Sequence, residues 1–283
     1  MGNVPSNPEE LASRVEDLFT LPDIYVKVKE LIDDPEASIG DIGNVVALDP
    51  GISARLLKFS NSAFFGQSRT VETVGRAVNI LGTQTVHDVI LATSVANAFS
   101  GIDDSVMDMA KFWSGSIYRG VVARLLAIEC GLLDSERVFV QGLLSDIGHL
   151  VMYKEIPELA AAAATQATES GAGLAAVERE LIGYDYAGVG GALMCAWELP
   201  ESITETVRHH TDLSQSTSFP LESAIVHLAC HIAVAAESDV DVSEWDLPVD
   251  PLAWQTTKLE QSIYSSIEEA ADAAVGEARE LFQ

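Results

Sequence analysis

Residues 106–130 carry apolar side chains at helical spacing on two adjoining faces, and this pattern constrains the fold more than any other feature of the chain. One stripe is formed by Trp113, Ile117, Val121 and Leu125, and the other by Tyr118, Val122 and Leu126. A helix that is apolar over so much of its circumference is buried by neighbouring helices. Gly131 follows the pattern, as is typical after a helix end. The segment is therefore predicted to be a central helix.

Apolar residues recur at three- and four-residue intervals along most of the remaining chain, and we find no strand pair or hairpin pattern. Ser38 and Asp41 form an S-x-x-D pattern that is typical of a helix start. Further helices are predicted at about 72–81, 85–99, 134–155, 174–182, 187–197, 201–210, 221–236 and 262–281. The predicted class is all-α.

The segment Ser100-Gly101-Ile102-Asp103-Asp104 is the expected joint between two helical lobes, because Gly and Asp cluster there between periodic segments. The lobes would be residues 1–104 and 105–283. Residues 238–251 are predicted to be an acidic loop. In the last helix, Ile263, Ile267 and Ala271 share one face, which either packs on its own lobe, as we expect, or binds a partner helix.

The chain carries 16 Lys and Arg against 43 Asp and Glu, a formal net charge of −27, while 48% of its residues are hydrophobic. A disordered acidic chain would have little apolar content, so these values indicate a well-packed protein with an acidic surface. Nucleic acid and anionic membranes both need clustered Lys and Arg, and neither is expected as a partner. Cationic residues that could neutralise a bound phosphate are few in the second lobe: Lys111, Arg119, Arg124, Arg137, Lys154, Arg179, Arg208 and Lys258.

Three cysteines, Cys130, Cys195 and Cys230, are widely spaced and odd in number, so a disulfide framework is not expected. The first residues show neither a basic nor an apolar region of the kind found in a signal peptide. The longest apolar stretch, residues 224–236, is interrupted by His227 and His231 and is shorter than the ~20 residues of a membrane span. A cytoplasmic location is expected.

Asp146 is the most informative polar residue, because it lies among apolar residues in the predicted helix 134–155. A buried carboxylate needs a partner, and we expect a neighbouring helix to supply one. Gly142 and Gly148 disfavour a helix by about 1 kcal/mol each relative to Ala, so close helix packing is expected there. His149 is expected to point away from Asp146.

The other histidines give weaker signals. His227 and His231 lie four residues apart, on one helix face, which can place two imidazoles on one metal ion. No HExxH pattern is present, and packing is the preferred interpretation. His87 precedes Asp88 in the first lobe without further ligand residues nearby, which indicates coincidence. His209 and His210 end a predicted helix.

Many short motifs stand in a specific order over residues 11–236. They are Leu21-Pro22, Asp49-Pro50, Arg55-Leu56-Leu57, Asn61-Ser62-Ala63-Phe64-Phe65, Ala77 to Gly82, Phe112-Trp113, Gly142 to Gly148, Val189-Gly190-Gly191, Trp197 to Pro200 and His209-His210. Together they resemble the HDOD family, the HD-related output domain of bacterial signalling proteins. The resemblance implies an N-terminal helical lobe packed on a helical bundle like that of HD domains. It also implies a module that is stand-alone or attached to other signalling domains, such as the receiver of a response regulator.

The resemblance also allows the metal-ligand positions of catalytic HD relatives to be compared one by one. The early His of those relatives corresponds to Gly115, and the His of the adjacent His-Asp pair corresponds to Ser145. The Asp of the pair is retained as Asp146. The later Asp corresponds to Cys230, and a further His position corresponds to Tyr186. Gly has no ligating side chain and Ser is a poor ligand for borderline metals, so neither a metal site nor a cofactor is expected.

The expected function is a non-catalytic signalling module that binds a protein segment or a small effector. A groove between the two lobes is the expected binding place, near Asn61, Ser62, Ser145, Asp146, His209 and His210. The alternative is a divergent metal-dependent phosphohydrolase that uses Asp146, His209 and His210, with or without His231.

Overall fold

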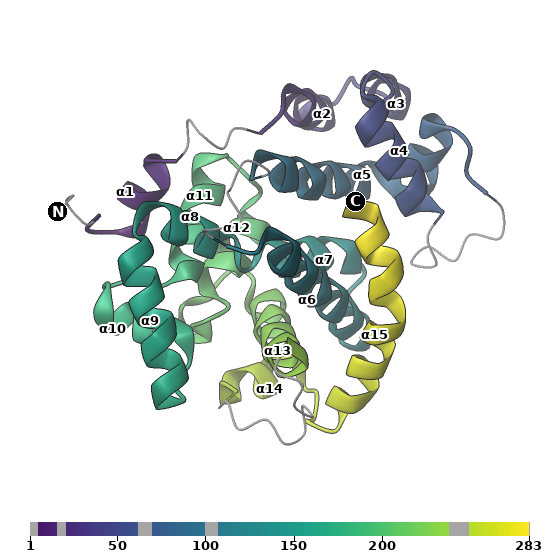
Figure 1. Cartoon of the computed structure of the whole chain (residues 1–283). Helices are drawn as coiled ribbons and strands as arrows, with labels where there is room; N and C mark the ends of the chain where they lie inside the picture. Colours follow the sequence, from purple (N-terminus) through teal and green to yellow (C-terminus); the bar gives the residue numbers. More distant parts are fainter. Residues whose placement is uncertain (1–4, 16–20, 62–69, 100–106, 238–248, 283) are drawn as a thin grey trace. The chain divides into compact units, whose positions relative to one another are not determined.

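The computed structural model describes residues 5–15, 21–61, 70–99, 107–237 and 249–282, and Figure 1 shows the helices in chain order. Every regular element in these ranges is an α-helix or a short 3-10 helix. The predicted all-α class is therefore confirmed. Among the described helices, none combines the length and apolar character that would let it cross a membrane.

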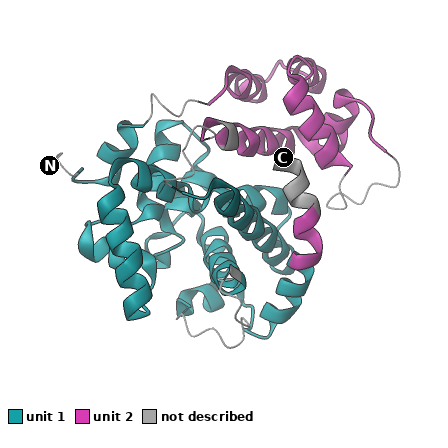
Figure 2. Ribbon diagram, in the orientation of Figure 1, with its two compact units in different colours: residues 1–19, 102–271 teal, residues 20–101, 272–283 magenta. Residues whose placement is uncertain are grey.

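The chain divides into two compact units, which Figure 2 colours separately. Unit 1 contains residues 1–19 and 102–271, and unit 2 contains residues 20–101 and 272–283. The lobes expected from the sequence were residues 1–104 and 105–283. In the structure, residues 1–19 belong to the same unit as the second lobe, and residues 272–283 to the same unit as the first. The predicted joint, residues 100–104, lies outside the described residues.

The N-terminal helix α1 (Pro8–Ser13) belongs to unit 1 because it packs on α8 (Ile147–Glu155) and α11 (Tyr186–Ala196). Leu11 and Ala12 are buried there. Sequence periodicity indicated the buried face of this helix but could not show which helices cover it.

Unit 2 is built around one long helix. Its helices are α2 (Asp23–Asp33), α3 (Ile39–Val46), α4 (Pro50–Ser60) and α5 (Val74–Ala98), and α5 packs against the other three. Ser38 and Asp41 form the predicted capping box at the start of α3. Gly82 interrupts α5 with a φ of +79°, at the position where the sequence predicted one helix to end and another to follow. The positive φ explains a glycine at this point.

Unit 1 is organised around α6 (Met109–Glu129), which packs against α7 (Ser135–Leu144) and α13 (Pro220–Glu237). Residues of both predicted stripes are buried, among them Ile117 and Val121 of one and Val122 and Leu126 of the other. This burial confirms the prediction of a central helix. The remaining elements are α9 (Pro157–Ser170), α10 (Leu174–Leu181), α12 (Glu201–His209), η2 (Leu213–Gln215), α14 (Pro251–Thr257) and the first part of α15 (Ile263–Phe282), which belongs to unit 2 from residue 272 on.

The end of unit 1 contains a helix that the sequence did not predict. Helix α14 begins at Pro251 and is capped by Asp250, the last residues of the segment expected to be a loop; residues 238–248 of that segment lie outside the described part. The ring of Trp254 on α14 contacts that of Tyr264 on α15, with centroids 5.3 Å apart. Ile267 and Ala271 are buried, so the start of α15 packs on its own chain, as expected.

The prediction of one continuous helix over residues 134–155 was wrong. Helix α7 ends at Leu144 and α8 begins at Ile147, with Ser145 and Asp146 in the turn between them. The hydroxyl of Ser145 donates to the carbonyl oxygen of Gly142 at 2.8 Å. Asp146 therefore does not lie in the middle of a helix but at the junction of two, which changes the helices that its side chain can reach.

Candidate functional site

Asp146 forms a buried ion pair with Arg119 of α6. The Nη2 atom of Arg119 lies 2.9 Å from Oδ2 of Asp146, and the two side chains are only 9% and 10% exposed. Burial alone raises the pKa of Asp146, but the positive charge of Arg119, the largest of the opposing effects, and that of His149 hold the pKa below its ordinary value. The expectation that a neighbouring helix supplies the partner of Asp146 is therefore confirmed.

Glycines bring α6 and α7 close enough for this pair to form. A Cβ atom on Gly142 would lie 2.8 Å from the carbonyl oxygen of Arg119 and 2.8 Å from Cβ of Ala123. A Cβ on Gly120 would lie 2.9 Å from the carbonyl oxygen of Phe139. Both contacts are too short for any side chain, which explains the helix-disfavouring glycine at position 142.

His149 extends the ion pair into a chain of charges. Its Nδ1 atom lies 4.0 Å from Oδ2 of Asp146, and its Nε2 atom lies 3.5 Å from Oε1 of the buried Glu178. Burial lowers the pKa of His149, yet the contact with Glu178 and the negative charges of Asp146 and Glu178 raise it overall. The expectation that His149 points away from Asp146 was wrong, because the turn at Ser145 and Asp146 reorients the first residues of α8.

Tyr186 and His210 form a second polar pair beside Asp146. The Nδ1 atom of His210 lies 2.8 Å from the carbonyl oxygen of Val207 and must donate to it, so Nε2 accepts from the Tyr186 hydroxyl at 3.3 Å. Burial lowers the pKa of His210 to about 4, and His210 is neutral at pH 7. Burial and the charge of Asp146 raise the pKa of Tyr186 well above its ordinary value. The ring of Tyr186 also stacks on His149.

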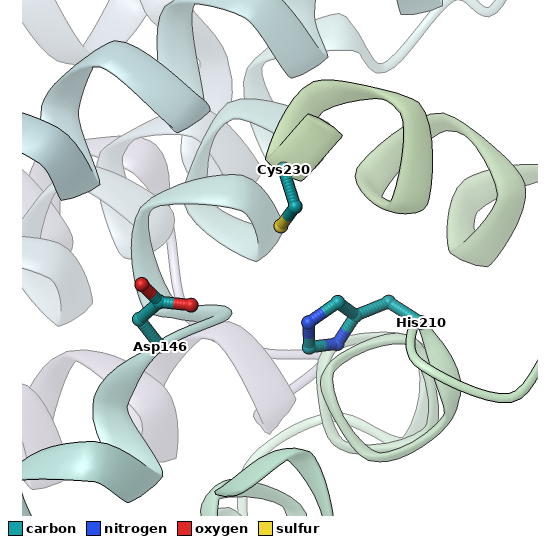
Figure 3. A group of neighbouring side chains, drawn as sticks. All are labelled: Asp146, His210 and Cys230. Carbon is teal, nitrogen blue, oxygen red and sulfur yellow. The ribbon is translucent and has the colours of Figure 1, made fainter. Parts of the chain in front are cut away.

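Cys230 of α13 completes the cluster. Its Sγ atom lies 3.6 Å from Oγ of Ser145. Figure 3 shows Asp146, His210 and Cys230 directed toward one another from three separate elements. One ligand atom from each lies within 4.8 Å of the others, an arrangement with the donor types of a metal centre.

The other residues of unit 1 that the sequence singled out do not belong to the cluster of Asp146, His210 and Cys230. Gly115 is buried on α6, one helical turn before Arg119. Among the described residues, His209 does not take part in the three-residue cluster, and neither does His231. His227 donates through Nδ1 to the carbonyl oxygen of His210 and accepts the N–H of Asp250 at Nε2, which supports the packing interpretation of the His227/His231 pair.

In unit 2, Asn61 joins backbone groups on either side of residues 62–69. Its amide nitrogen donates to the carbonyl oxygens of Leu57 and Val71, and its amide oxygen accepts the N–H of Val71 at 2.6 Å. Ser62 lies outside the described residues. The two units are described separately, so the groove expected between them stays a prediction.

Also in unit 2, His87 bonds to Asp88 and to the hydroxyl of Tyr25, each at 3.1 Å. These three buried residues satisfy one another. The His-Asp dipeptide in this unit is a local packing feature, as expected.

Two residues of the site were not identified in this role from the sequence. Arg119 was noted only as a cation that could neutralise phosphate, and Glu178 was not noted. An Arg among buried apolar residues, as Arg119 is on α6, is a signal for a buried ion pair, because burying its charge needs a carboxylate. Glu178 carries no comparable signal, since two other charged residues, Arg179 and Glu180, follow it on α10.

Comparison with known proteins gives a family and a fold. The model of the family described as "HDOD domain" matches residues 18–213. A protein of Treponema pallidum (strain Nichols), described as uncharacterized, is 25% identical over 207 residues, which are 72% of this chain. The chain spans only 39% of the length of that relative.

Two solved structures are similar over nearly the whole chain. A proposed phosphohydrolase of Shewanella amazonensis SB2B has a TM-score of 0.73 at 22% identity, covering 99% of this chain and 100% of that protein. A proposed signal transduction protein of Marinobacter aquaeolei VT8 has a TM-score of 0.69 at 18% identity, covering 99% of this chain and 68% of that protein. At these identities the likeness establishes the fold alone, and the two names point to different functions.

Proposed function

The chain belongs to the HDOD domain family, and from that premise we propose that it is a non-catalytic signal-transduction module. It acts by binding a protein segment or a small effector, either alone or as an output domain of a response regulator. We propose no cofactor, no nucleic-acid or membrane partner, and a cytoplasmic location. The net charge of −27 supports a partner surface that is basic or apolar.

The observation that carries the proposal is the chemistry at the positions where catalytic HD relatives hold their metal. Gly115 offers no side chain. The hydroxyl of Ser145 is donated to Gly142, and that of Tyr186 is donated to His210. Only Asp146 keeps a ligand of the expected type, and it is paired with Arg119. One available carboxylate does not support metal-activated hydrolysis.

His210 lies in one group with Asp146 and Cys230, and its ring is already hydrogen-bonded. Both ring nitrogens of His210 have protein partners, Val207 at Nδ1 and Tyr186 at Nε2. A metal ion would have to displace the Tyr186 hydroxyl from Nε2 of His210 and to bind Asp146 beside the positive charge of Arg119. The residues present therefore do not fit a resident metal ion without rearrangement.

The alternative is a divergent metal-dependent phosphohydrolase. The observation that favours it is the convergence of Asp146, His210 and Cys230. This ligand set differs from the one expected for that alternative, since it contains Cys230 in place of His209 and His231.

Hydrolysis assays separate the two functions. The full chain is incubated with bis(p-nitrophenyl) phosphate and Mn²⁺, Co²⁺, Zn²⁺ or Fe²⁺, beside an Asp146→Asn variant prepared identically. We expect the two proteins to release p-nitrophenol at the same background rate. Metal-dependent turnover approaching about 1 s⁻¹ that disappears in Asp146→Asn would overturn the proposal.

A further inference from the structure

The inference concerns the cation that Asp146 binds. Four charged side chains alternate in sign through the interior of unit 1: Arg119, Asp146, His149 and Glu178. When His149 is protonated, the four charges sum to zero. A buried carboxylate is stable only beside a positive charge or strong donors. Arg119 supplies that charge at 2.9 Å, from the central helix of the unit.

The same carboxylate belongs to the group of Asp146, His210 and Cys230, whose ligand atoms lie within 4.8 Å of one another. Tetrahedral zinc, with bonds of about 2.0–2.3 Å, places ligand atoms about 3.5 Å apart. The three residues thus have suitable donor types within 4.8 Å of one another, near the separation that one bound ion needs. Arg119 holds Asp146 on one side, and Tyr186 holds His210 on the other.

We propose that Arg119 is the built-in cation of this site and that it excludes a divalent metal ion from Asp146, His210 and Cys230. When a neutral side chain replaces Arg119, the three residues become a site for Zn²⁺ or Co²⁺, the ions that suit a mixed carboxylate, imidazole and thiolate set. The inference goes beyond the proposed function, because metal binding decides it and hydrolysis does not.

The test is a titration of the full chain with Co²⁺. Arg119→Met removes the charge at similar length, and Arg119→Lys retains it. Arg124→Met is the matched control, because Arg124 lies on the same helix but pairs with Glu136, which is not a member of the cluster. Nη2 of Arg124 lies 3.4 Å from Oε1 of Glu136. We expect Arg119→Met to bind one Co²⁺ about 100-fold or more tightly than the original chain, Arg119→Lys and Arg124→Met.

The ligands are identified by spectroscopy. A cobalt-bound thiolate gives a sulfur-to-metal charge-transfer band, which we expect in Arg119→Met and not in Arg119→Met/Cys230→Ser. Adding Tyr186→Phe to Arg119→Met frees Nε2 of His210 while keeping the ring that stacks on His149, and should tighten binding further.

Three results would overturn the inference. One is stoichiometric Co²⁺ binding by the original chain, with a thiolate band that Cys230→Ser removes. Another is Co²⁺ binding by Arg119→Lys equal to that of Arg119→Met. The third is a folded Arg119→Met variant that binds no Co²⁺. A metal-binding original chain that hydrolyses nothing would refute this inference and leave the proposed function intact.

The inference remains testable if Arg119→Met does not fold alone. Arg119→Met/Asp146→Asn lacks both buried charges and serves as the folded reference. We then expect Zn²⁺, but not Mg²⁺, to restore the helical circular dichroism of Arg119→Met. Failure of Zn²⁺ to do so, with the double variant folded, would count against the inference as decisively as the titration.

Discussion

A Cβ atom on Gly148 would collide with the carbonyl oxygen of Tyr186. Helices α8 and α11 therefore touch backbone to backbone, directly beside the residues of the site. The contact brings His149 against the ring of Tyr186, with centroids 3.9 Å apart. It fixes the spacing between Asp146 and the Tyr186–His210 pair.

Gly148→Ala is predicted to destabilise the protein by about 3 kcal/mol or more, because a backbone carbonyl cannot move away as a side chain can. Gly276→Ala is the control, since Gly276 is on α15 and a Cβ atom there meets nothing within 4 Å. That variant should be neutral or up to about 1 kcal/mol more stable. Urea unfolding followed by circular dichroism measures both, and equal stability of the two variants would contradict the close approach.

Arg119→Met and Asp146→Asn are each predicted to destabilise the protein by about 3–5 kcal/mol, because each leaves a buried charge or polar group without its partner. The double variant should lose less than the sum by about 1–3 kcal/mol. A double-mutant cycle of unfolding free energies checks this, and strict additivity would show that the pair is not coupled.

The coupling energy between Arg119 and Asp146 should be lost only at acidic pH. Since the folded pKa of Asp146 is lowered, its contribution is present above the ordinary carboxyl pKa of 3.8 and is lost as the pH falls through the folded value. The cycle should therefore give the same coupling energy at every pH between 5 and 8.

His210 is predicted to remain neutral, with its proton on Nδ1, from pH 8 down to about pH 5. Because its folded pKa is about 4, below the ordinary 6.5, its contribution to stability is complete above pH 6.5 and is lost as the pH falls toward 4. The unfolding free energy of the original chain minus that of His210→Gln should fall by about 1.4 kcal/mol per pH unit in this window. Nitrogen NMR of the imidazole reports the tautomer, and an imidazolium signal at pH 6 would refute the prediction.

Asn61→Ala is predicted to destabilise the protein by about 2–3 kcal/mol, because three hydrogen bonds to Leu57 and Val71 are lost together. Asn79→Ala is the matched control, since Asn79 makes one exposed amide bond, to Gly75, and should cost less than about 1 kcal/mol. Thermal unfolding compares them. Equal melting temperatures would mean that Asn61 does not stabilise unit 2.

Several local features could be predicted from the sequence because neighbouring residues determine them. The capping box of Ser38 and Asp41 and the helix end at Gly82 depend only on hydrogen bonds and backbone angles within a few residues. The break at Asp146 could not be predicted in this way, since the residues from Val140 to Leu150 keep helical spacing across it. The close contact of Gly148 with α11, a helix that is remote in the sequence, stabilises the break.

The sequence by itself determined the all-α class, the central position of residues 106–130, the family, and the need of Asp146 for a partner. The ordered motifs indicated the family. Periodicity and composition suffice for the other three, because they report which face of each helix is buried. Only the tertiary structure decided that the partner is Arg119, that His149 faces Asp146, and that Cys230 lies beside Ser145. Those pairings join residues up to 85 positions apart. They depend on how closely helices approach and where a helix breaks, which the spacing of apolar residues along one helix does not encode.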